Sequence, residues 1–307
     1  MLNEVIYLLD PKRGGIFVDG TLGGGGHSLE VLKRLPSGSK LYGIDRDEAA
    51  IMAASSRLKR FMPAFEAIRG NFFDMKQILA QRGVFGVDGI LLDLGVSSYQ
   101  LDLAERGFSY HDEAPLDMRM DSDAALCAYD VVNGYSEAEL TRIIKEYGEE
   151  RFASKVAKRI VNERKERPIA TTTQLSNIIK SALGAAAYKE AQHPARRTFQ
   201  AIRIEVNGEL NGLEQAIDDA ESILNPGGVL AVITFHSLEA KIVKQCFKRY
   251  EDPCICDKKA PICVCQKKPS SRIITKKALI ASKEEMDDNP RSRSAQLRAI
   301  KKLDHVK

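Results

Sequence analysis

Four consecutive glycines at residues 23–26 could bring the backbone close to a bound ligand. The apolar segment before them, residues 14–19, predicts a β-strand that ends on Asp19, and Ser28 begins a helical pattern. Glycine is a poor former of strands and helices, so this run needs another reason to be there. A glycine turn between a strand and a helix N-terminus is a common ligand-binding arrangement. The alternative is a flexible surface loop.

The glycine turn is followed by an acid at the distance expected for a ribose contact. The turn does not spell G-x-G-x-x-G and no Gly-Lys-Ser/Thr follows, which argues against a dinucleotide site or a P-loop. Asp45 ends the next predicted strand, about twenty residues on, where a carboxylate meets a ribose diol. Asp47 can serve as the helix cap instead. A nucleoside without a pyrophosphate, such as S-adenosylmethionine, fits this pattern, with its amino-acid end along the backbone amides of Gly25, Gly26 and His27.

A third acid, Asp93, follows the predicted strand at residues 87–92 and precedes Leu-Gly-Val-Ser-Ser. Methyl transfer depends mostly on positioning, but an exocyclic base amine is a weak nucleophile. It needs an acceptor for its N–H while the C–N bond forms, and the candidates are Asp93 and the carbonyls of the turn that follows it. Capping a turn is the alternative role for Asp93. Phe72 could pack on an adenine or belong to the core, and for His27 we expect a backbone contact rather than a role as base or metal ligand.

These residues require a parallel sheet to bring them together. Predicted strands alternate with helices over residues 1–104, which indicates right-handed crossovers and helices on both faces of the sheet. Ligands of such sheets lie beyond the carboxyl ends of the strands. The predicted strands are residues 16–18, 40–44, 65–69 and 87–92, and the helices between them are residues 28–35, 47–60 and 74–82.

The middle of the chain lacks convincing strands. Residues 136–146, 151–164 and 172–183 have helical spacing, and the strand–helix pattern resumes with a helix at 207–224 and a strand at 229–234. We therefore predict one discontinuous α/β domain, residues 1–104 and 204–307, with an inserted all-helical domain at residues 105–203. Two sequential domains are the alternative, but the strand at 229–234 would then lack a sheet.

Composition narrows the class of protein. The 307 residues are 44% hydrophobic and 29% charged, with a net charge of +4, as in globular proteins. There is no apolar run of membrane-spanning length and no signal-peptide pattern, so we expect no membrane partner and a cytoplasmic protein. The small positive charge is a weak indication of an anionic partner.

Four of the six cysteines form the pattern C-I-C-x6-C-V-C. Four thiols this close could bind Zn²⁺ tetrahedrally, although C-x-C is less typical of zinc sites than C-x-x-C. A disulfide is unfavourable in cytoplasm. The candidate ligands are Cys254, Cys256, Cys263 and Cys265.

Three further segments carry candidate substrate-binding residues. In PLDMRMD, Asp117 and Arg119 alternate with methionines, which indicates a structured rim of the active site rather than a solvated charge run. In HPARRTFQAIRIEVN, Arg197 and Arg203 could contact phosphates while apolar residues face a core. His236 follows the strand at 229–234 and could meet the target nucleotide or close the pocket.

Several motifs together resemble the bacterial 16S ribosomal RNA cytosine-N4 methyltransferases, the MraW/RsmH family. They span essentially the whole chain and include VDGTLGGGGHS, DGILLDLGVSS, PLDMRMD, HPARRTFQAIRIEVN, GGVLAVITFHSLE and NPRSRSAQLR. The resemblance implies S-adenosylmethionine as methyl donor and a class I Rossmann-like methyltransferase core with a helical insertion. It implies a cytosine in the decoding region of 16S rRNA, within the small ribosomal subunit, as acceptor. The cofactor contacts it implies are Gly25, Gly26, His27, Asp45, Phe72, Asp93 and Gln100.

Two features depart from related patterns. The chain starts at about the family's first helix, without the His-x-Pro-Val stretch that usually precedes it. The turn after residue 93 is Asp-Leu-Gly-Val, as in the family, and not the Asp-Pro-Pro-Tyr of DNA amino-methyltransferases. The aromatic that would stack on the target base is therefore open among Tyr99, Phe108 and Tyr110. Two alternative functions stay open: a non-catalytic RNA-binding assembly factor and a methyltransferase with another substrate. The oligomeric state, monomer or homodimer, also stays open.

Overall fold

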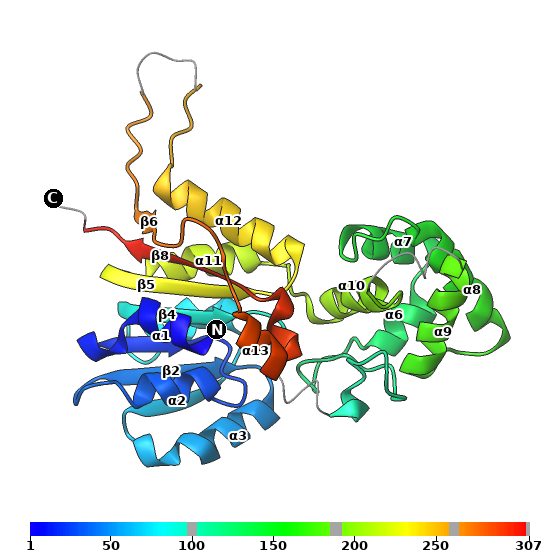
Figure 1. The fold of residues 1–307 in the computed structure, drawn as a ribbon, viewed down its shortest axis with the longest axis horizontal. Helices are drawn as coiled ribbons and strands as arrows, with labels where there is room; N and C mark the ends of the chain where they lie inside the picture. The colour runs from blue at the N-terminus through cyan, green and yellow to red at the C-terminus, as the bar shows by residue number, and fades with distance from the viewer. Residues whose placement is uncertain (97–102, 185–191, 258–263, 305–307) are drawn as a thin grey trace. The chain divides into compact units, whose positions relative to one another are not determined.

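The computed structural model describes residues 1–96, 103–184, 192–257 and 264–304. The chain divides into two compact units, one formed by Met1–Gly95 with Leu210–Lys307 and the other by Val96–Glu209. The first unit is discontinuous in sequence because the second is inserted after its fourth strand (Figure 1).

The first unit is built on one sheet with the strand order β3-β2-β1-β4-β5-β8-β6, in which β7 also pairs with β8. The five strands from β3 to β5 are parallel to their neighbours, and β8 runs antiparallel to β5, β6 and β7. The described strands are β1 (Ile16–Asp19), β2 (Lys40–Asp45), β3 (Phe65–Arg69), β4 (Val87–Asp93), β5 (Leu224–Thr234), β6 (Ser271–Ile273), β7 (Leu279–Ile280) and β8 (Gln296–Lys302).

Helices cover both faces of this sheet because its strands are apolar on both sides. In β5, Leu230 and Val232 face one core, whereas Ala231 and Ile233 face the other, as the two-residue period of a strand requires. The first core includes residues of α4 (Met75–Ala80), α11 (Leu213–Ser222) and α12 (Ser237–Glu251). The second includes residues of α1 (Leu2–Leu9), α2 (Gly26–Leu32) and α3 (Glu48–Leu58). A last short helix of this unit is α13 (Lys283–Asp288).

The second unit is helical, with its own apolar core. Its amphipathic helices bury rows such as Ile143 with Ile144 and Val156 with Ile160. The described helices are α6 (Ala128–Gly134), α7 (Glu137–Glu146), α8 (Ala153–Glu166), α9 (Thr172–Leu183) and α10 (Arg196–Asn207). The predicted fold class, a mainly parallel α/β sheet with an inserted helical region, is confirmed.

One predicted helix was wrong in its bounds. The helix expected at 207–224 is shorter in the structure: α11 spans Leu213–Ser222, and Asn207 is instead the last residue of α10. Gly208 and Gly212 both have positive φ, 58° and 87°, which ends α10 and caps α11. The strand expected at 229–234 begins earlier, at Leu224, with a register shift opposite β4.

Among the described helices, none combines the length and apolar composition that a transmembrane segment requires.

Asp88 of β4 connects three strands at the edge of the sheet where the parallel strands begin. Its Oδ2 accepts a hydrogen bond from the Ile16 amide at 2.8 Å, and its Oδ1 accepts one from Nδ2 of Asn225 at 3.0 Å. We predict that Asp88→Ala lowers the free energy of unfolding by about 1–3 kcal/mol, because a part-buried amide loses its acceptor. Urea denaturation measures this, with the exposed Asp287→Ala as control. Equal midpoints for the two variants would contradict the prediction.

Candidate active site

Three neighbouring parallel strands each end in an aspartate at the same edge of the sheet. β2, β1 and β4 are adjacent, and their last residues are Asp45, Asp19 and Asp93. The carboxyl ends of parallel strands at a change in strand order are the usual ligand site of such sheets. The three aspartates therefore lie at strand ends, as predicted. Their hydrogen-bond partners differ, and so do the roles that each can have.

The glycine turn is held to both neighbouring strands. The Gly20 amide donates to the carbonyl of Leu91 at 2.9 Å, and the Leu22 amide donates to the carbonyl of Ile44 at 3.0 Å. The Gly23 amide donates to Oδ2 of Asp45 at 2.7 Å. The path of the turn is thus set by β4 on one side and β2 on the other.

Two of the four glycines border open space. A Cβ added at Gly24 or Gly26 would meet no atom of the described residues within 4 Å, apart from its neighbours along the chain. Gly25 differs: its φ of 72° is in the left-handed region, and an added Cβ would lie 3.1 Å from Cδ1 of Leu58. The turn therefore presents bare backbone to an open side, where Gly25, Gly26 and His27 begin α2.

Asp19 has a structural role inside the turn. It is buried, its Oδ1 accepts from the Thr21 amide at 3.2 Å, and its Oδ2 accepts from the Ser28 hydroxyl at 2.7 Å. Both oxygens are engaged within the segment, so Asp19 fixes the turn to the start of α2.

Asp45 and Asp47 divide the two functions that the sequence proposed for them. Asp47 accepts from the Ala49 amide at 3.0 Å and caps α3, as predicted. The oxygens of Asp45 accept from the Gly23 amide and, at 2.9 Å, from the Asp47 amide. Burial raises the pKa of Asp45. Each of its oxygens has a second lone pair that could accept from a ligand hydroxyl.

Asp93 is the acid least satisfied by its surroundings. Its Oδ1 is buried and makes no hydrogen bond to the described residues, and its Oδ2 lies 3.6 Å from Nδ1 of His27. Its amide donates to the Thr21 hydroxyl at 2.6 Å. Burial raises the pKa of Asp93 to about 7 and lowers the pKa of His27. A buried carboxylate oxygen without a partner is costly unless a ligand donor reaches it.

Thr21 is a residue of this site that the sequence reasoning missed. Its hydroxyl accepts from the Asp93 amide, which holds the end of β4 against the turn. The available signal was its position directly after Gly20, where a short hydroxyl side chain can reach the neighbouring backbone.

Phe72 lies beside the glycine turn, in a short 3-10 helix at Phe72–Asp74 that follows β3. It is half-buried, packs edge-to-face on Phe73 with ring centroids 4.7 Å apart, and its Cβ would lie 3.1 Å from a Cβ added at Gly20. This position is compatible with either role that the sequence left open, packing on a base or lining the core.

His236 caps a helix. Its Nδ1 accepts from the Glu239 amide at 3.4 Å, while Glu239 Oε2 accepts from the Phe235 amide at 2.8 Å, at the start of α12. Nε2 of His236 lies 3.1 Å from Glu239 Oε1, at ion-pair distance but without hydrogen-bond geometry. These contacts support a structural role at the end of β5.

The charged substrate-binding candidates of the helical unit are paired with acids. Arg119 binds Asp117, with Nη2 and Oδ2 2.7 Å apart. Arg203 makes two hydrogen bonds to Glu209, at 2.8 and 2.7 Å. Arg197 lies 3.7 Å from Glu150. A phosphate would have to compete with these carboxylates or bind the remaining N–H groups.

Of the base-stacking candidates, Phe108 is buried in the core of the helical unit. Tyr110 is half-buried and stacks on His193, with ring centroids 4.5 Å apart. Tyr99 and Gln100 lie outside the described residues, as does Cys263. Cys254, Cys256 and Cys265 lie close together beyond the C-terminus of α12, whereas His236 caps the N-terminus of that helix.

Comparison with known proteins identifies the family to which the chain belongs. The model of the MraW methylase family matches residues 1–303. A protein of Clostridium botulinum named Ribosomal RNA small subunit methyltransferase H is 54% identical over 303 residues, 99% of this chain and 97% of that protein. A protein of Lachnospira eligens with the same name is 50% identical, over 99% of this chain and 96% of its own length. Among solved structures, an rRNA methylase from Streptococcus thermophilus has a TM-score of 0.41 at 12% identity, covering 99% of this chain and 94% of its own.

The raised pKa of Asp93 predicts a pH-dependent stability. Its carboxyl binds a proton more tightly in the folded chain, so stability from this group is greatest below the unfolded pKa and falls as pH rises toward 7. Between pH 5 and pH 8 we expect Asp93→Asn to gain about 1–3 kcal/mol of stability relative to the unsubstituted protein. Urea denaturation at several pH values measures the difference, with Asp287→Asn as control. Parallel curves for Asp93→Asn and the unsubstituted protein would refute it.

Proposed function

Because the chain belongs to the MraW methylase family, we propose that it transfers a methyl group from S-adenosylmethionine to the N4 amino group of a cytosine in 16S rRNA. Matches over 99% of the chain to relatives that are named as small-subunit rRNA methyltransferases support the substrate class. The observation that carries the proposal is the buried Oδ1 of Asp93, which has no hydrogen-bond partner among the described residues and lies beside a bare glycine turn.

The residues present fit an adenosine-type methyl donor. The open side of Gly24 and Gly26 leaves room for its amino-acid end against the backbone of Gly25, Gly26 and His27. Asp45 has lone pairs for the ribose hydroxyls, and Phe72 borders the turn where the adenine would lie. Gln100 completes the set of contacts that we infer for the donor. When bound, the donor supplies a methyl group on a sulfonium, an electrophile without need of a metal.

Asp93 then acts on the acceptor. One of its oxygens accepts an N–H of the cytosine amino group and orients the nitrogen lone pair toward the methyl carbon. The N–C bond would form at the expense of the carbon–sulfur bond, with S-adenosylhomocysteine as the leaving group, and Asp93 or water would accept the amino proton. A carboxyl with a pKa of about 7 is ionised in part at neutral pH and suits this exchange of a proton.

The helical insertion would recognise the RNA. We place the catalytic core at residues 1–104 and 204–307 and the recognition domain at 105–203. Arg197 and Arg203 would contact phosphates by exchanging carboxylate partners, and Asp117 with Arg119 would form a rim of the site. His236 would support the nucleotide pocket through its cap of α12. A 16S rRNA substrate implies a cytoplasmic protein.

The donor site is tested by Asp45→Ala. We expect its affinity for S-adenosylhomocysteine, measured by calorimetry, to fall at least tenfold because the ribose loses its acceptor. Asp47→Ala is the matched control: it removes the cap of α3, which costs about 1 kcal/mol of stability, and leaves the ribose contact intact. Equal affinities of the two variants would contradict the assignment. Absence of binding to the unsubstituted protein would favour a non-catalytic assembly factor.

The reaction is tested by nucleoside analysis of 16S rRNA from cells with and without the protein. We expect N4-methylated cytidine to disappear with the protein and to return with the unsubstituted gene or with Asp287→Ala. Asp93→Ala should restore at most about 1% of the methylation rate, since a positioned acid–base group contributes about a hundredfold or more. A near-normal rate for Asp93→Ala would exclude its role, and an unchanged nucleoside profile would exclude the substrate.

A further inference from the structure

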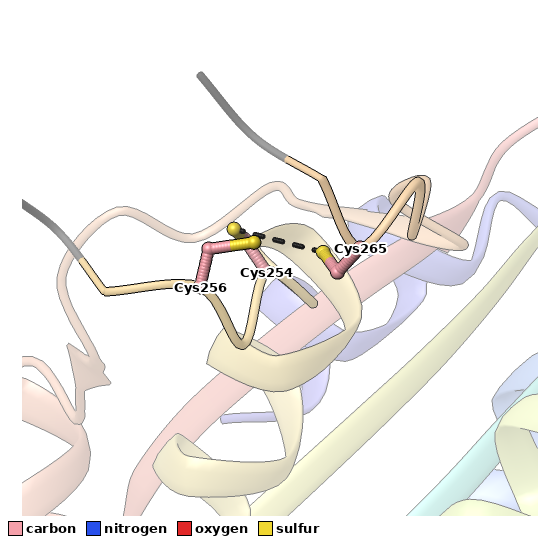
Figure 2. A group of neighbouring side chains, drawn as sticks. All are labelled: Cys254, Cys256 and Cys265. Atoms are coloured by element: carbon pink, nitrogen blue, oxygen red, sulfur yellow. Dashed lines mark hydrogen bonds between the residues drawn. The ribbon is translucent and has the colours of Figure 1, made fainter. Parts of the chain in front are cut away.

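Three cysteines converge outside the methyltransferase site. Cys254 and Cys256 follow the C-terminus of α12, and Cys265 lies on the segment that returns to β6. Their side chains point toward one another, and the three sulfurs lie within 4.8 Å of each other (Figure 2). Sγ of Cys265 lies 3.8 Å from Sγ of Cys254.

The distance between the sulfurs of Cys254 and Cys265 is that of neighbouring ligands in a metal–thiolate site. In a tetrahedral zinc site with Zn–S bonds of about 2.3 Å, neighbouring sulfurs lie about 3.8 Å apart. A disulfide requires about 2.05 Å, and no disulfide joins any two of these three described sulfurs. Sulfurs at these distances can therefore bind one metal ion with little rearrangement.

The ligand type narrows the metal. Thiolates select Zn²⁺ or Cu(I) and disfavour Mg²⁺ and Ca²⁺, which take oxygen ligands. Zinc is redox-inert and binds three or four protein ligands tetrahedrally.

The described apolar residues beside the cysteines are not packed into a core. Ile255, between the first two cysteines, is 72% exposed, and Val264, beside the third, is 78% exposed. In small segments without a core, a bound metal commonly supplies the missing cross-link. The location also argues for a structural ion, because the 15-residue α12 separates these sulfurs from His236 by about 22 Å of helix.

We propose that Cys254, Cys256 and Cys265 bind one Zn²⁺ as thiolates, which joins the end of α12 to the segment before β6. Cys263 is the other cysteine of this stretch of sequence and lies outside the described residues. The site carries no step of methyl transfer, so its test does not depend on the proposed function.

Metal analysis of the full chain, purified under reducing conditions without chelator, tests this site. We expect close to one equivalent of zinc, or its uptake when Zn²⁺ is added to the reduced protein. The double variant Cys254→Ser/Cys265→Ser should retain less than a tenth of an equivalent. Cys127→Ser, a half-buried cysteine of the helical unit that caps α6, should bind as much zinc as the unsubstituted chain.

Three controls keep the result decisive. Circular dichroism and a cooperative urea transition establish that the double variant is folded. Co²⁺ in place of zinc should give the visible and thiolate-to-metal bands of a tetrahedral thiolate site, lost in the double variant. Proteolysis within the 254–265 segment should accelerate at least tenfold when a strong chelator removes the metal. Three results would overturn the proposal. They are less than a tenth of an equivalent of zinc after addition of Zn²⁺, a disulfide among these cysteines that persists under reducing conditions, and the same zinc content in the double variant as in the unsubstituted protein.

Discussion

The site depends on the hydrogen bonds that tie one turn to the two strands beside it. The turn after β1 donates amides to Leu91 on β4 and to Ile44 and Asp45 on β2, while Thr21 accepts from the Asp93 amide. These bonds set the distance between the glycine backbone, the acid of β2 and the acid of β4. Because each strand is buried on both faces, none of them can shift without disturbing a core. The edge of a rigid sheet thereby becomes a preorganised site.

The three aspartates at the strand ends have different roles because their hydrogen-bond partners differ. Asp19 uses both oxygens on its own turn and needs nothing from a ligand. Asp45 divides its oxygens between the turn and α3 and retains lone pairs. Asp93 has one buried oxygen without a hydrogen-bond partner in the described part of the chain, and burial raises the pKa of its carboxyl to about 7. Such a group destabilises the folded chain at neutral pH, which is the usual compromise between stability and a reactive site.

Metal binding and methyl transfer would use opposite ends of α12. At its N-terminus, His236 and Glu239 cap the helix next to the end of β5. Beyond its C-terminus, Cys254 and Cys256 meet Cys265, which precedes β6 at the margin of the sheet (Figure 1). A zinc ion there would stabilise the connection between two core elements without touching the reacting groups. The arginines of the helical unit differ again, since carboxylates already hold them and an RNA phosphate would compete for them.

The sequence by itself determined the alternation of strands and helices, the acids at the strand ends, the cap at Asp47 and the spacing of the cysteines. These features follow from local patterns: the periodicity of apolar residues and the positions of glycine and of capping residues. Such patterns involve only residues that are close together in the sequence. Only the tertiary structure decided that Asp19 is bound within its own turn and that the Thr21 hydroxyl accepts a hydrogen bond from the Asp93 amide. It also decided that Phe108 belongs to the core of the helical unit. The tertiary structure likewise decided that the helix expected at 207–224 begins only at Leu213, after Gly208 and Gly212. Hydrogen-bond partners and burial depend on residues brought together from distant parts of the chain, which no local pattern encodes.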